Sequence, residues 1–419
     1  MRTIVDLHMH SHYSRATSKK LDLFGIAKFA AIKGVDVIST GDITHPKWTE
    51  EIEEHLEEDG SGFLRLKDAA NLDGGETLFT LFGEVASMYK KNGVGRRVHT
   101  LFGVSSIAAA KKVNEVLVKK GFNIAYDGRP IVGMDVKELA KIYLDADPHA
   151  LIIPAHIWTP WFAMFGSKSG FDSIEECFEE MSEHVYAIET GLSSDPDMNW
   201  RVSNLNNITI LSNSDAHSAQ KIGREANVFN WDERSYDVMY ESIKNNENLE
   251  YTIEFYPEEG KYHTDGHRKC EVRMDPAETR KNKGLCPKCT LPLVVGVLNR
   301  GEELADQKPE DRPKRVPFKS IVPLPEIIAN AFGCGVNTKR VTVEFEKMIE
   351  QIGNEFYILL DAPLEEVRAV ANPLVAEGVK RVREGNVNIS PGYNGVFGTV
   401  EVFTDKERDK LTQSQHGLF

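Results

Sequence analysis

The stretch 3-TIVDLHMH-10 predicts a buried strand that runs directly into two histidines. Alternate side chains of a strand lie on one face, so His8 and His10 point the same way while Leu7 and Met9 point the other way. Two adjacent imidazoles at a strand end are expensive to bury and well placed to bind a metal ion. An isolated pair is more often two hydrogen-bonded surface histidines, so a metal site depends on the rest of the chain.

Roughly the first 230 residues alternate β-branched runs with amphipathic helical stretches, which is typical of a parallel α/β fold. Apolar residues at helical spacing predict helices at 22–33, 107–119 and 136–144. The number of strand candidates is close to the number in a (β/α) barrel. They are 3-TIV-5, 35-VDVIST-40, 78-LFTLFG-83, 98-VHTLFGV-104, 150-ALIIPA-155, 185-VYAIET-190 and 208-ITILSN-213.

The alternation stops after Trp231, and the rest of the sequence divides into two further parts. We predict a catalytic barrel over 1–245, a Cys- and His-containing domain over 246–305, and a linker with a C-terminal domain over 306–419. Five prolines between 307 and 325 predict an extended linker or an ordered arm. Beyond it we expect helices at 326–332, 341–352 and 363–377, strands at 356–360 and 399–403, and a polar, mobile tail after Thr404.

Length and composition limit the class of protein. A chain of 419 residues exceeds one ordinary domain of about 150 residues, so two or three domains are expected. No apolar run approaches the roughly 20 residues of a membrane span, and residues 1–2 leave no room for a signal peptide before the first strand. We therefore expect a cytoplasmic protein with no membrane partner, and a monomer.

The charge of −14 argues against a nucleic-acid partner only if it is spread evenly. Residues 261–340 hold 16 Lys and Arg against 10 Asp and Glu, so the rest of the chain carries −20. A basic segment beside a carboxylate-rich one suits a metal-dependent enzyme that acts on a polyanion. Ordinary variation in charge explains the excess equally well.

Metal-capable side chains lie at or near the end of almost every strand candidate. The carboxyl ends of parallel barrel strands converge on one face, where active sites lie, so these residues are expected to share a polynuclear site. They are His8, His10, Asp42, Glu84, His99, His156, Glu189, Asp215 and His217.

Histidine and carboxylate ligands without thiolates suit Zn²⁺ or Mn²⁺ in a hydrolytic site. One tetrahedral ion cannot use so many ligands, so two or three ions are expected, with Glu84 as a bridging carboxylate. Clustered ions activate water and neutralise phosphate oxygens, which favours phosphoester hydrolysis.

A second cluster predicts a zinc ribbon. His267 and Cys270 form an HxxC knuckle, and Cys286 and Cys289 form a CxxC knuckle 15 residues later. Four protein ligands fill a tetrahedral ion, so this zinc is expected to be structural. His263 is an alternative ligand to His267. A redox-active CxxC is the other interpretation, but no flanking βαβ pattern supports it.

The barrel residues resemble the PHP (polymerase and histidinol phosphatase) superfamily, on the HxH pair, Asp42, Glu84, the later histidines and 214-SDAH-217. Within it, the chain is similar to the endonuclease Q family of DNA repair enzymes. The matching stretches are 38-ISTGDITHPKW-48, 154-PAHIWTPWFAMFGSKSGFDSIEECF-178, 188-IETGLSSDPDMNWRVS-203, 211-LSNSDAHSAQKIGREAN-227, 261-KYHTDGHRKC-270, 286-CPKC-289 and 321-IVPLPEIIA-329.

The resemblance implies a distorted (β/α)7 barrel with three metal ions, followed by the ribbon and a small α+β C-terminal domain. It implies a first ion on His8, His10, Glu84 and Asp215, a second on Glu84, His99 and His156, and a third on His217 with Asp42. Arg15 stands where many PHP sequences have a third-metal ligand, so His45 or a water is expected to complete that site. The catalytic residues would be Asp215, Glu84, His8 and His10, with Glu189 and Asp6 as candidates to orient an imidazole.

Basic and aromatic residues outside the metal sites are candidates for DNA contact. Lysines and arginines position phosphates, whereas aromatic side chains in loops stack on a flipped base. Packing in the core is the better interpretation for any single aromatic residue. The candidates are Trp158, Trp161, Arg268, Lys269, Arg273, Lys314, Arg315 and Tyr393.

The resemblance implies an endonuclease that cuts DNA on the 5′ side of deaminated bases (uracil, hypoxanthine, xanthine), and of abasic sites as a further substrate. It would use two or three Zn²⁺ ions, with Mn²⁺ or Mg²⁺ as alternatives in catalysis. Two rival hypotheses are a PHP phosphatase of small phosphate esters and a DNA-binding module with a vestigial site. The C-terminal 413-QSQHGLF-419 suggests a weak sliding-clamp peptide.

Overall fold

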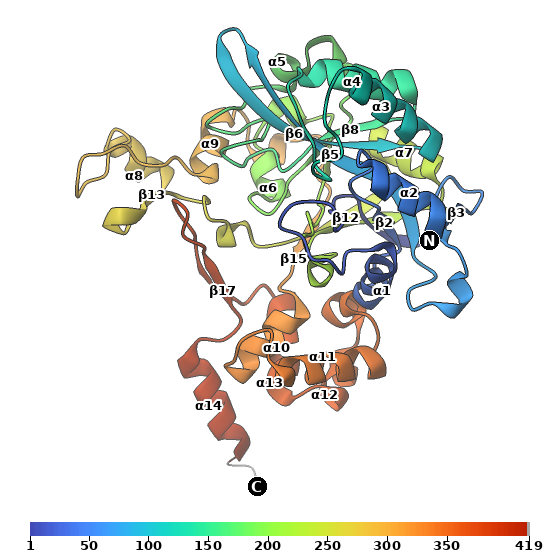
Figure 1. The fold of residues 1–419 in the computed structure, drawn as a ribbon. Helices are drawn as coiled ribbons and strands as arrows, with labels where there is room; N and C mark the ends of the chain where they lie inside the picture. The colour runs from blue at the N-terminus through green and yellow to red at the C-terminus, as the bar shows by residue number, and fades with distance from the viewer. Residues whose placement is uncertain (417–419) are drawn as a thin grey trace.

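The computed structural model describes residues 1–416, with side chains through residue 412 (Figure 1). Its largest unit is an 11-stranded sheet in the order β15-β12-β11-β1-β2-β5-β4-β3, with β6, β7 and β8 joined beside β5. The strands are β1 (Arg2–Asp6), β2 (Val37–Ser39), β3 (Leu56–Glu58), β4 (Leu64–Leu66), β5 (Leu78–Lys91), β6 (Val94–Val104), β7 (Ile131–Val132), β8 (Leu151–Pro154), β11 (Ala226–Asn230), β12 (Leu249–Glu254) and β15 (Phe318–Ser320).

All seven expected strand runs form strands, the last two being β9 (Ala187–Glu189) and β10 (Thr209–Leu211), which pair in parallel. The distorted α/β barrel is therefore confirmed. The expected parallel pairing holds for β1 with β2 and for β2 with β5, but β1 pairs antiparallel with β11, and β6 pairs antiparallel with both β5 and β8.

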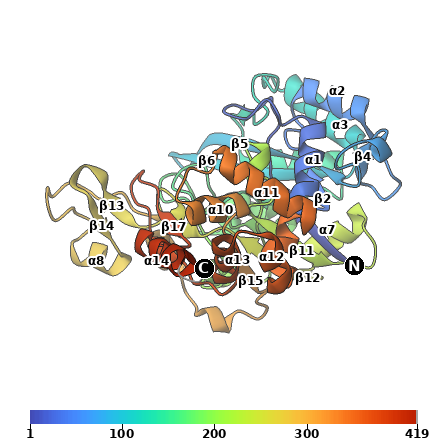
Figure 2. The ribbon, with the colours of Figure 1, turned by 90° about the horizontal axis from the view of Figure 1, so that it is seen from below.

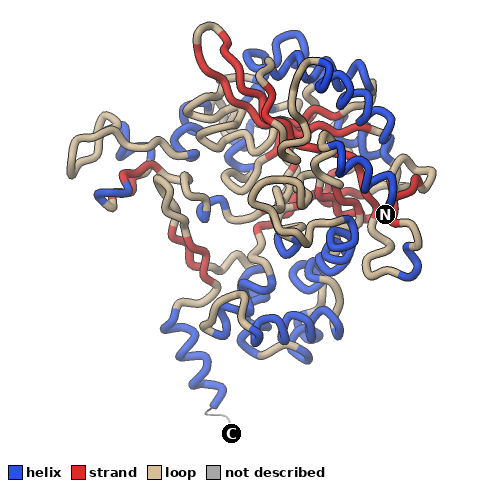
Figure 3. The backbone as a smooth tube through the Cα atoms, in the orientation of Figure 1, coloured by secondary structure: helices blue, strands red, loops and turns tan. Residues whose placement is uncertain are grey.

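The long hairpin of β5 and β6 arises from its turn. Asn92 and Gly93 have φ angles of 53° and 79°, the conformation that a two-residue hairpin turn requires. The two strands then pair from Lys91 with Val94 back to Leu81 with Val104. Figure 3 shows this pair projecting well beyond the other strands. An Asn-Gly pair between alternating residues was the available signal for this hairpin.

Helices cover the sheet, and the three that the sequence predicted at 22–33, 107–119 and 136–144 are all present. Asp22 accepts a hydrogen bond from Gly25 N at the start of α1, and Gly34, with a φ of 90°, ends the helix. Its apolar face, including Leu23 and Ile26, is fully buried. The barrel helices are α1 (Leu23–Lys33), α2 (Pro46–His55), α3 (Ile107–Lys119), α4 (Val136–Ala146), α5 (Ile174–Phe178), α6 (Pro196–Asn199) and α7 (Tyr236–Lys244). Short turns are η1 (Ala69–Asn71), η2 (Glu179–His184), η3 (Ser203–Leu205), η4 (Ala219–Lys221), η5 (Pro257–Glu259), η6 (Arg268–Cys270) and η7 (Pro309–Asp311).

A small unit projects to one side of the barrel between β12 and β15, as Figures 1 and 2 both show. It contains β13 (Asp265–His267), β14 (Val272–Met274) and α8 (Pro276–Lys281), and α9 (Val297–Leu304) leads back to the barrel. The proline-rich segment that follows is an ordered arm. Arg312 is buried and donates hydrogen bonds to the carbonyls of Leu205 and Ile208. The chain then rejoins the main sheet, where β15 pairs in parallel with β12.

The C-terminal part is mostly helical, and its helices pack side by side except for the last, which projects away from them (Figures 1 and 2). They are α10 (Leu324–Phe332), α11 (Lys339–Gln351), the π-helical η8 (Tyr357–Asp361), α12 (Leu364–Val370), α13 (Pro373–Arg383) and α14 (Asp405–His416), with the hairpin β16 (Asn388–Ser390) and β17 (Thr399–Glu401).

Three expectations in this part are wrong. The apolar run 356–360 is helical because Asn354 caps it through Tyr357 N, whereas a short apolar run alone cannot distinguish strand from helix. The helix expected over 363–377 is interrupted before Pro373, whose ring does not fit a helix interior. The polar tail forms α14, which Thr404 and Glu407 cap by reciprocal hydrogen bonds. The suggested clamp peptide extends past the described residues.

Among the described residues, every helix is too short or too polar to cross a bilayer.

Candidate metal centre

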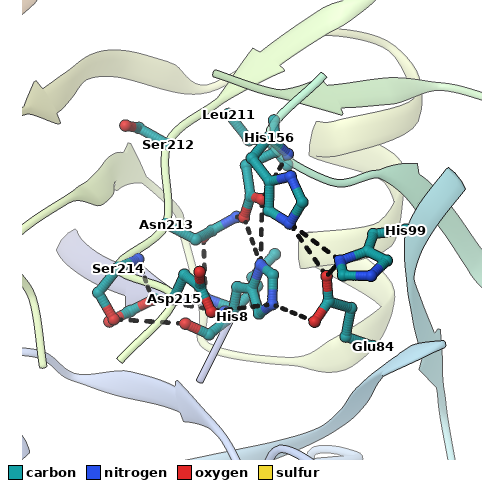
Figure 4. Close-up of polar contacts among 12 residues, drawn as sticks. His8, Glu84, His99, His156, Leu211, Ser212, Asn213, Ser214 and Asp215 are labelled. Carbon is teal, nitrogen blue, oxygen red and sulfur yellow. Dashed lines mark hydrogen bonds and ion pairs between the residues drawn. The ribbon is translucent and has the colours of Figure 1, made fainter. Parts of the chain in front are cut away.

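The metal-capable side chains converge on one point inside the barrel (Figure 4). His8 and His10 follow β1, His156 follows β8, and Asp215 follows β10. Glu84 and His99 lie within the β5–β6 hairpin, whose register pairs Glu84 with Leu101 and Ala86 with His99. Glu84 and His99 are therefore diagonal neighbours on one face of the hairpin. The Glu84 Oε1 to His99 Nδ1 distance is 2.6 Å.

Three groups of residues could each hold an ion, because their ligand atoms lie within 4.8 Å of one another. They are His8, His10 and Glu84; His10, Asp215 and His217; and Glu84, His99 and His156. The second and third share no residue, but each shares one with the first, so the three groups form a chain.

Glu84 lies at the middle of this arrangement. Its Oε1 is 3.0 Å from His156 Nε2, and its Oε2 is 3.5 Å from His10 Nε2 and 3.7 Å from His8 Nε2. The two oxygens therefore face different pairs of imidazoles, an arrangement in which a carboxylate can bridge two ions. His8 Nε2 is buried and has no hydrogen-bond partner among the described residues. An orphaned, inward-facing imidazole nitrogen fits a metal ligand.

Two buried carboxylates orient the histidines of the first strand. Glu189 accepts from His8 Nδ1 at 3.0 Å, and Asp42 accepts from His10 Nδ1 at 3.1 Å. Each imidazole is thereby held with Nε2 facing the centre. Glu189 also accepts hydrogen bonds from His156 N and Asn213 Nδ2, so it links three of the loops that build the site.

The structure does not bring two of the expected third-site residues into these groups. Asp42 uses its other oxygen on Ser11 N, at 2.7 Å, and on the Ser11 and Ser14 hydroxyls. His45 donates from Nε2 to Ala125 O and stacks on a neighbouring tyrosine ring. Among the described residues, neither belongs to a group that could hold an ion, and His10 and Asp215 lie beside His217 in their place.

Asp6 does not orient an imidazole side chain. Its carboxylate is fully buried and accepts hydrogen bonds from Ser214 N and Gly223 N, each at 3.0 Å. Asp6 therefore holds the backbone on both sides of the loop that carries Asp215 and His217.

The charges of the cluster shift the acidity of its members. Burial opposes a charge on His10, but hydrogen bonds to Asp215 and Asp42 raise its pKa to about 9. Burial lowers the pKa of His99 to about 4 despite the nearby Glu84 carboxylate. Burial also opposes ionisation of Glu84, yet His99 and Arg129 hold the pKa of Glu84 well below its usual range. Metal binding must therefore displace a proton from His10 while Glu84 is already ionised.

The backbone is strained where three of these side chains leave their strands. Asp42, His156 and Asp215 have φ angles of 48°, 33° and 45°. A non-glycine residue in this region costs about 1–3 kcal/mol, and such residues concentrate at functional sites. A side chain on Gly191 would collide with His156, so the tight approach of these two loops requires glycine.

The second cluster lies in the projecting unit. His267, Cys270, Cys286 and Cys289 place one ligand atom each within 4.8 Å of the others, which fits a tetrahedral zinc site. The apolar cluster beneath it is small, with Val272, Met274, Cys286 and Leu293 as its buried members. A core of this size contributes little stability by itself, which favours a structural metal ion at these four ligands. His263 is buried and lies outside this group.

Two family models and two uncharacterised relatives match this chain. A family model described as "PHP-associated" matches residues 197–248, and a model of the MJ0043 C-terminal domain matches 323–386. The uncharacterised protein MJ0043 of Methanocaldococcus jannaschii is 36% identical over 58% of this chain and 31% of its own length, so the chain spans about a third of that relative. The uncharacterised protein YqxK of Bacillus subtilis is 28% identical over 88% of this chain and 89% of its own.

Two solved structures resemble nearly the whole chain. The lesion-specific endonuclease PfuEndoQ from Pyrococcus furiosus superposes with a TM-score of 0.83 and 30% identity, over 96% of this chain and 95% of that one. A structure of endonuclease Q with a 27-mer duplex substrate, with an abasic lesion at the active site, gives the same TM-score and identity over 97% and 98%. The chain belongs to the endonuclease Q family.

Membership of the endonuclease Q family makes this chain a hydrolase of the PHP type.

The residues expected to contact DNA differ in their exposure to solvent. Trp158 is fully buried and donates to Asn199 Oδ1, so it is a core residue and the prediction of a DNA contact is wrong. Tyr393 is half-buried against Gly266 at the base of the ribbon. The other candidates are exposed, namely Trp161, Arg268, Lys269, Arg273, Lys314 and Arg315.

Sequence reasoning missed two arginines at the centre of this endonuclease Q site. Arg129 donates from Nη1 to Glu84 Oε2 at 3.0 Å. Arg224 donates from Nε to Ser214 O at 2.7 Å and so holds the loop of Asp215. Neither arginine lies at a strand end, which is the position that the predicted metal ligands share. The Asp-Gly pair in 127-DGRP-130 is a turn signal, but it does not indicate a role for the arginine that follows.

Proposed function

We propose that this chain is a metal-dependent DNA repair endonuclease that hydrolyses the phosphodiester on the 5′ side of deaminated bases in duplex DNA. The observation that carries the proposal is the match to endonuclease Q over about 96% of the chain at 30% identity, with the metal-capable residues clustered in the barrel. Uracil, hypoxanthine and xanthine are the proposed lesions, with abasic sites as a further substrate.

The barrel residues supply the chemistry of hydrolysis. His8, His10, His99, His156 and His217 would hold two or three Zn²⁺ ions together with Glu84 and Asp215. When bound, such ions lower the pKa of water and neutralise phosphate oxygens. Glu84 would serve as a ligand shared by neighbouring ions, and Glu189 and Asp42 keep His8 and His10 oriented toward the same centre. Mn²⁺ or Mg²⁺ are the alternatives in catalysis.

The parts outside the barrel would hold the substrate. The exposed Arg268 and Lys269 on the ribbon would contact phosphates, as would Lys314 and Arg315 on the arm. Trp161 is 39% exposed in the loop after His156, where an aromatic ring could stack on a base flipped out of the duplex. A deaminated base pairs weakly, so flipping it requires less free energy than flipping a normal base. A monomer, without a sliding clamp as obligatory partner, suffices for these steps.

The test uses one set of labelled duplexes that differ only in a central base, together with a panel of small phosphomonoesters. We expect the wild-type protein to nick the uracil, hypoxanthine and xanthine duplexes on the 5′ side of the lesion, leaving 3′-hydroxyl and 5′-phosphate ends. Hydrolysis of the phosphomonoesters with no nicking would instead support the phosphatase. Asp215→Ala should abolish nicking and keep most DNA binding. An Asp215→Ala protein that cuts at the normal rate would contradict the site assignment.

A further inference from the structure

Arg129 occupies a tightly fixed position at the mouth of the metal centre. It lies in the loop between α3 and β7, where Gly128 N donates to Tyr13 O at 3.2 Å and Thr44 Oγ1 donates to Gly128 O at 3.3 Å. A side chain on Gly128 would collide with Asp42 and Ser14. The loop is therefore packed directly on the residues that orient His10, and Arg129 is not a freely moving surface arginine.

The guanidinium of Arg129 points into the cluster. Its Nη1 is 3.0 Å from Glu84 Oε2, the oxygen that also faces His8 and His10. The Arg129 side chain is 29% exposed whereas Glu84 is fully enclosed. The guanidinium thus contacts the Glu84 carboxylate, and the Arg129 side chain as a whole is partly open to the solvent from which a substrate must approach.

A permanent positive charge at this position needs an explanation. A guanidinium cannot bind a metal ion, since it offers only donors and does not deprotonate in proteins. Two divalent ions would balance the four carboxylates of the site, namely Glu84, Asp215, Asp42 and Glu189, so Arg129 and any third ion would leave an excess of positive charge. A positive excess that faces solvent is satisfied by an anion with several oxygen acceptors. Guanidinium donors match phosphate oxygens in geometry as well as in charge.

We propose that Arg129 binds a non-bridging oxygen of the phosphodiester that is cut. The inference rests on the proposed function and adds a substrate-contacting residue to that site. In the reaction, the oxygen of water bonds to phosphorus, the bond between phosphorus and O3′ breaks, and O3′ leaves with a proton. Negative charge accumulates on the non-bridging oxygens as the water attacks. Arg129 binds this charge more strongly in the transition state than in the ground state, so it lowers the barrier.

The experiment compares Arg129→Ala and Arg129→Lys with wild type on a uracil-containing duplex. Metal content, melting temperature, kcat and KM are measured for each protein. We expect Arg129→Ala to keep its metal ions and its melting temperature while kcat falls about 100- to 1000-fold, the usual loss for one donor to a transition-state oxygen. Arg129→Lys should recover part of kcat, because it restores the charge without the paired donors.

Sulfur substitution gives a readout that a merely structural role would not change. Replacing each non-bridging oxygen at the cut site by sulfur in turn should slow the wild-type protein at the oxygen that Arg129 binds. Arg129→Ala should lose most of that discrimination and keep the effect at the other oxygen. Arg65→Ala is the matched control, since Arg65 pairs with Glu57 on the exposed surface, and it should leave every measurement unchanged.

The outcomes separate the two proposals. If wild type cuts the damaged duplex and Arg129→Ala cuts it within threefold of the wild-type rate, the role of Arg129 is refuted and the endonuclease stands. If Arg129→Ala loses metal ions or fails to fold while Arg129→Lys is fully active, Arg129 has a structural role and the proposal is also refuted. If wild type cuts no duplex, the proposed function fails and the assignment of Arg129 fails with it.

Discussion

Replacing Glu189 by Gln tests whether the metal centre depends on a carboxylate that does not itself belong to a metal group. Glu189 is fully buried, and each of its oxygens already has two donors. Oε1 faces His8 Nδ1 and Asn213 Nδ2, and Oε2 faces His8 Nδ1 and His156 N. A glutamine amide group would present its own donor to one of these pairs, whichever way it is oriented.

The size of the effect follows from these contacts. One buried donor, either Asn213 Nδ2 or His156 N, loses its acceptor in Glu189→Gln, which costs about 1–3 kcal/mol of unfolding free energy in the metal-free protein. His8 also loses the charge that holds the proton on its Nδ1, so its Nε2 becomes a poorer ligand. Loss of such an orienting partner weakens metal binding about 10- to 100-fold.

Chemical denaturation of the metal-free protein and zinc titration against a competing chelator measure the two effects separately. Glu233→Gln is the control, because Glu233 is exposed and the same change of charge is made away from the site. A Glu189→Gln protein whose zinc affinity stays within twofold of wild type would show that the orientation of His8 does not depend on this carboxylate.

Three other changes have outcomes that the structure defines. Cys286→Ser should remove one equivalent of zinc and expose the ribbon to proteolysis while the barrel ions remain, and Cys334→Ser should retain that zinc; equal zinc content in the two variants would contradict the ribbon site. Burial raises the pKa of Glu254 from 4.5 to about 8, so its contribution to stability is complete below 4.5 and is lost as the pH rises through 8. Denaturation between pH 5 and 9 should therefore show a slope of up to about 1.4 kcal/mol per pH unit that Glu254→Gln reduces, and an unchanged slope would refute the assignment. Lys33→Met should leave the buried Glu355 unpaired at a cost of about 3–5 kcal/mol, and adding Glu355→Gln should restore most of it; equal stability of the single and double variants would exclude the ion pair as the cause.

The fold and the candidate site were predictable to different degrees. The positions of the strands and of His8, Glu84 and Asp215 follow from local patterns, because apolar runs mark strands and metal-capable side chains follow them. Strand direction was predictable only for the β5–β6 hairpin, which the Asn92-Gly93 turn signals, and not for the antiparallel pairing of β1 with β11, whose residues lie more than 200 positions apart. The position of a residue in sequence also does not reveal whether its side chain is buried, as Trp158 shows.

The sequence also could not distinguish the residues that could bind a metal ion from those that only orient a metal-binding histidine. Asp42 and Glu189 have the same chemistry as Asp215 and lie at equivalent strand ends. Only the three-dimensional positions show that Asp42 and Glu189 hold the Nδ1 side of an imidazole, whereas Asp215 lies on the Nε2 side. Arg129 gave no signal at all, because a loop arginine near a carboxylate is recognised only after the chain has folded.

The pairing of β1 with β11 has a consequence for synthesis of the protein in the cell. One edge of β1 can pair early with β2, but Arg2 on its other edge pairs with Asn230, so that edge waits for a strand that the ribosome makes more than 200 residues later. At about 5–20 residues per second, that interval is roughly 10–45 s. During it, His8 and His10 have left the ribosome while Asp215 is still to be made. The two histidines are thus made long before Asp215 of the same cluster, so the candidate metal centre is one of the last parts of the barrel to form.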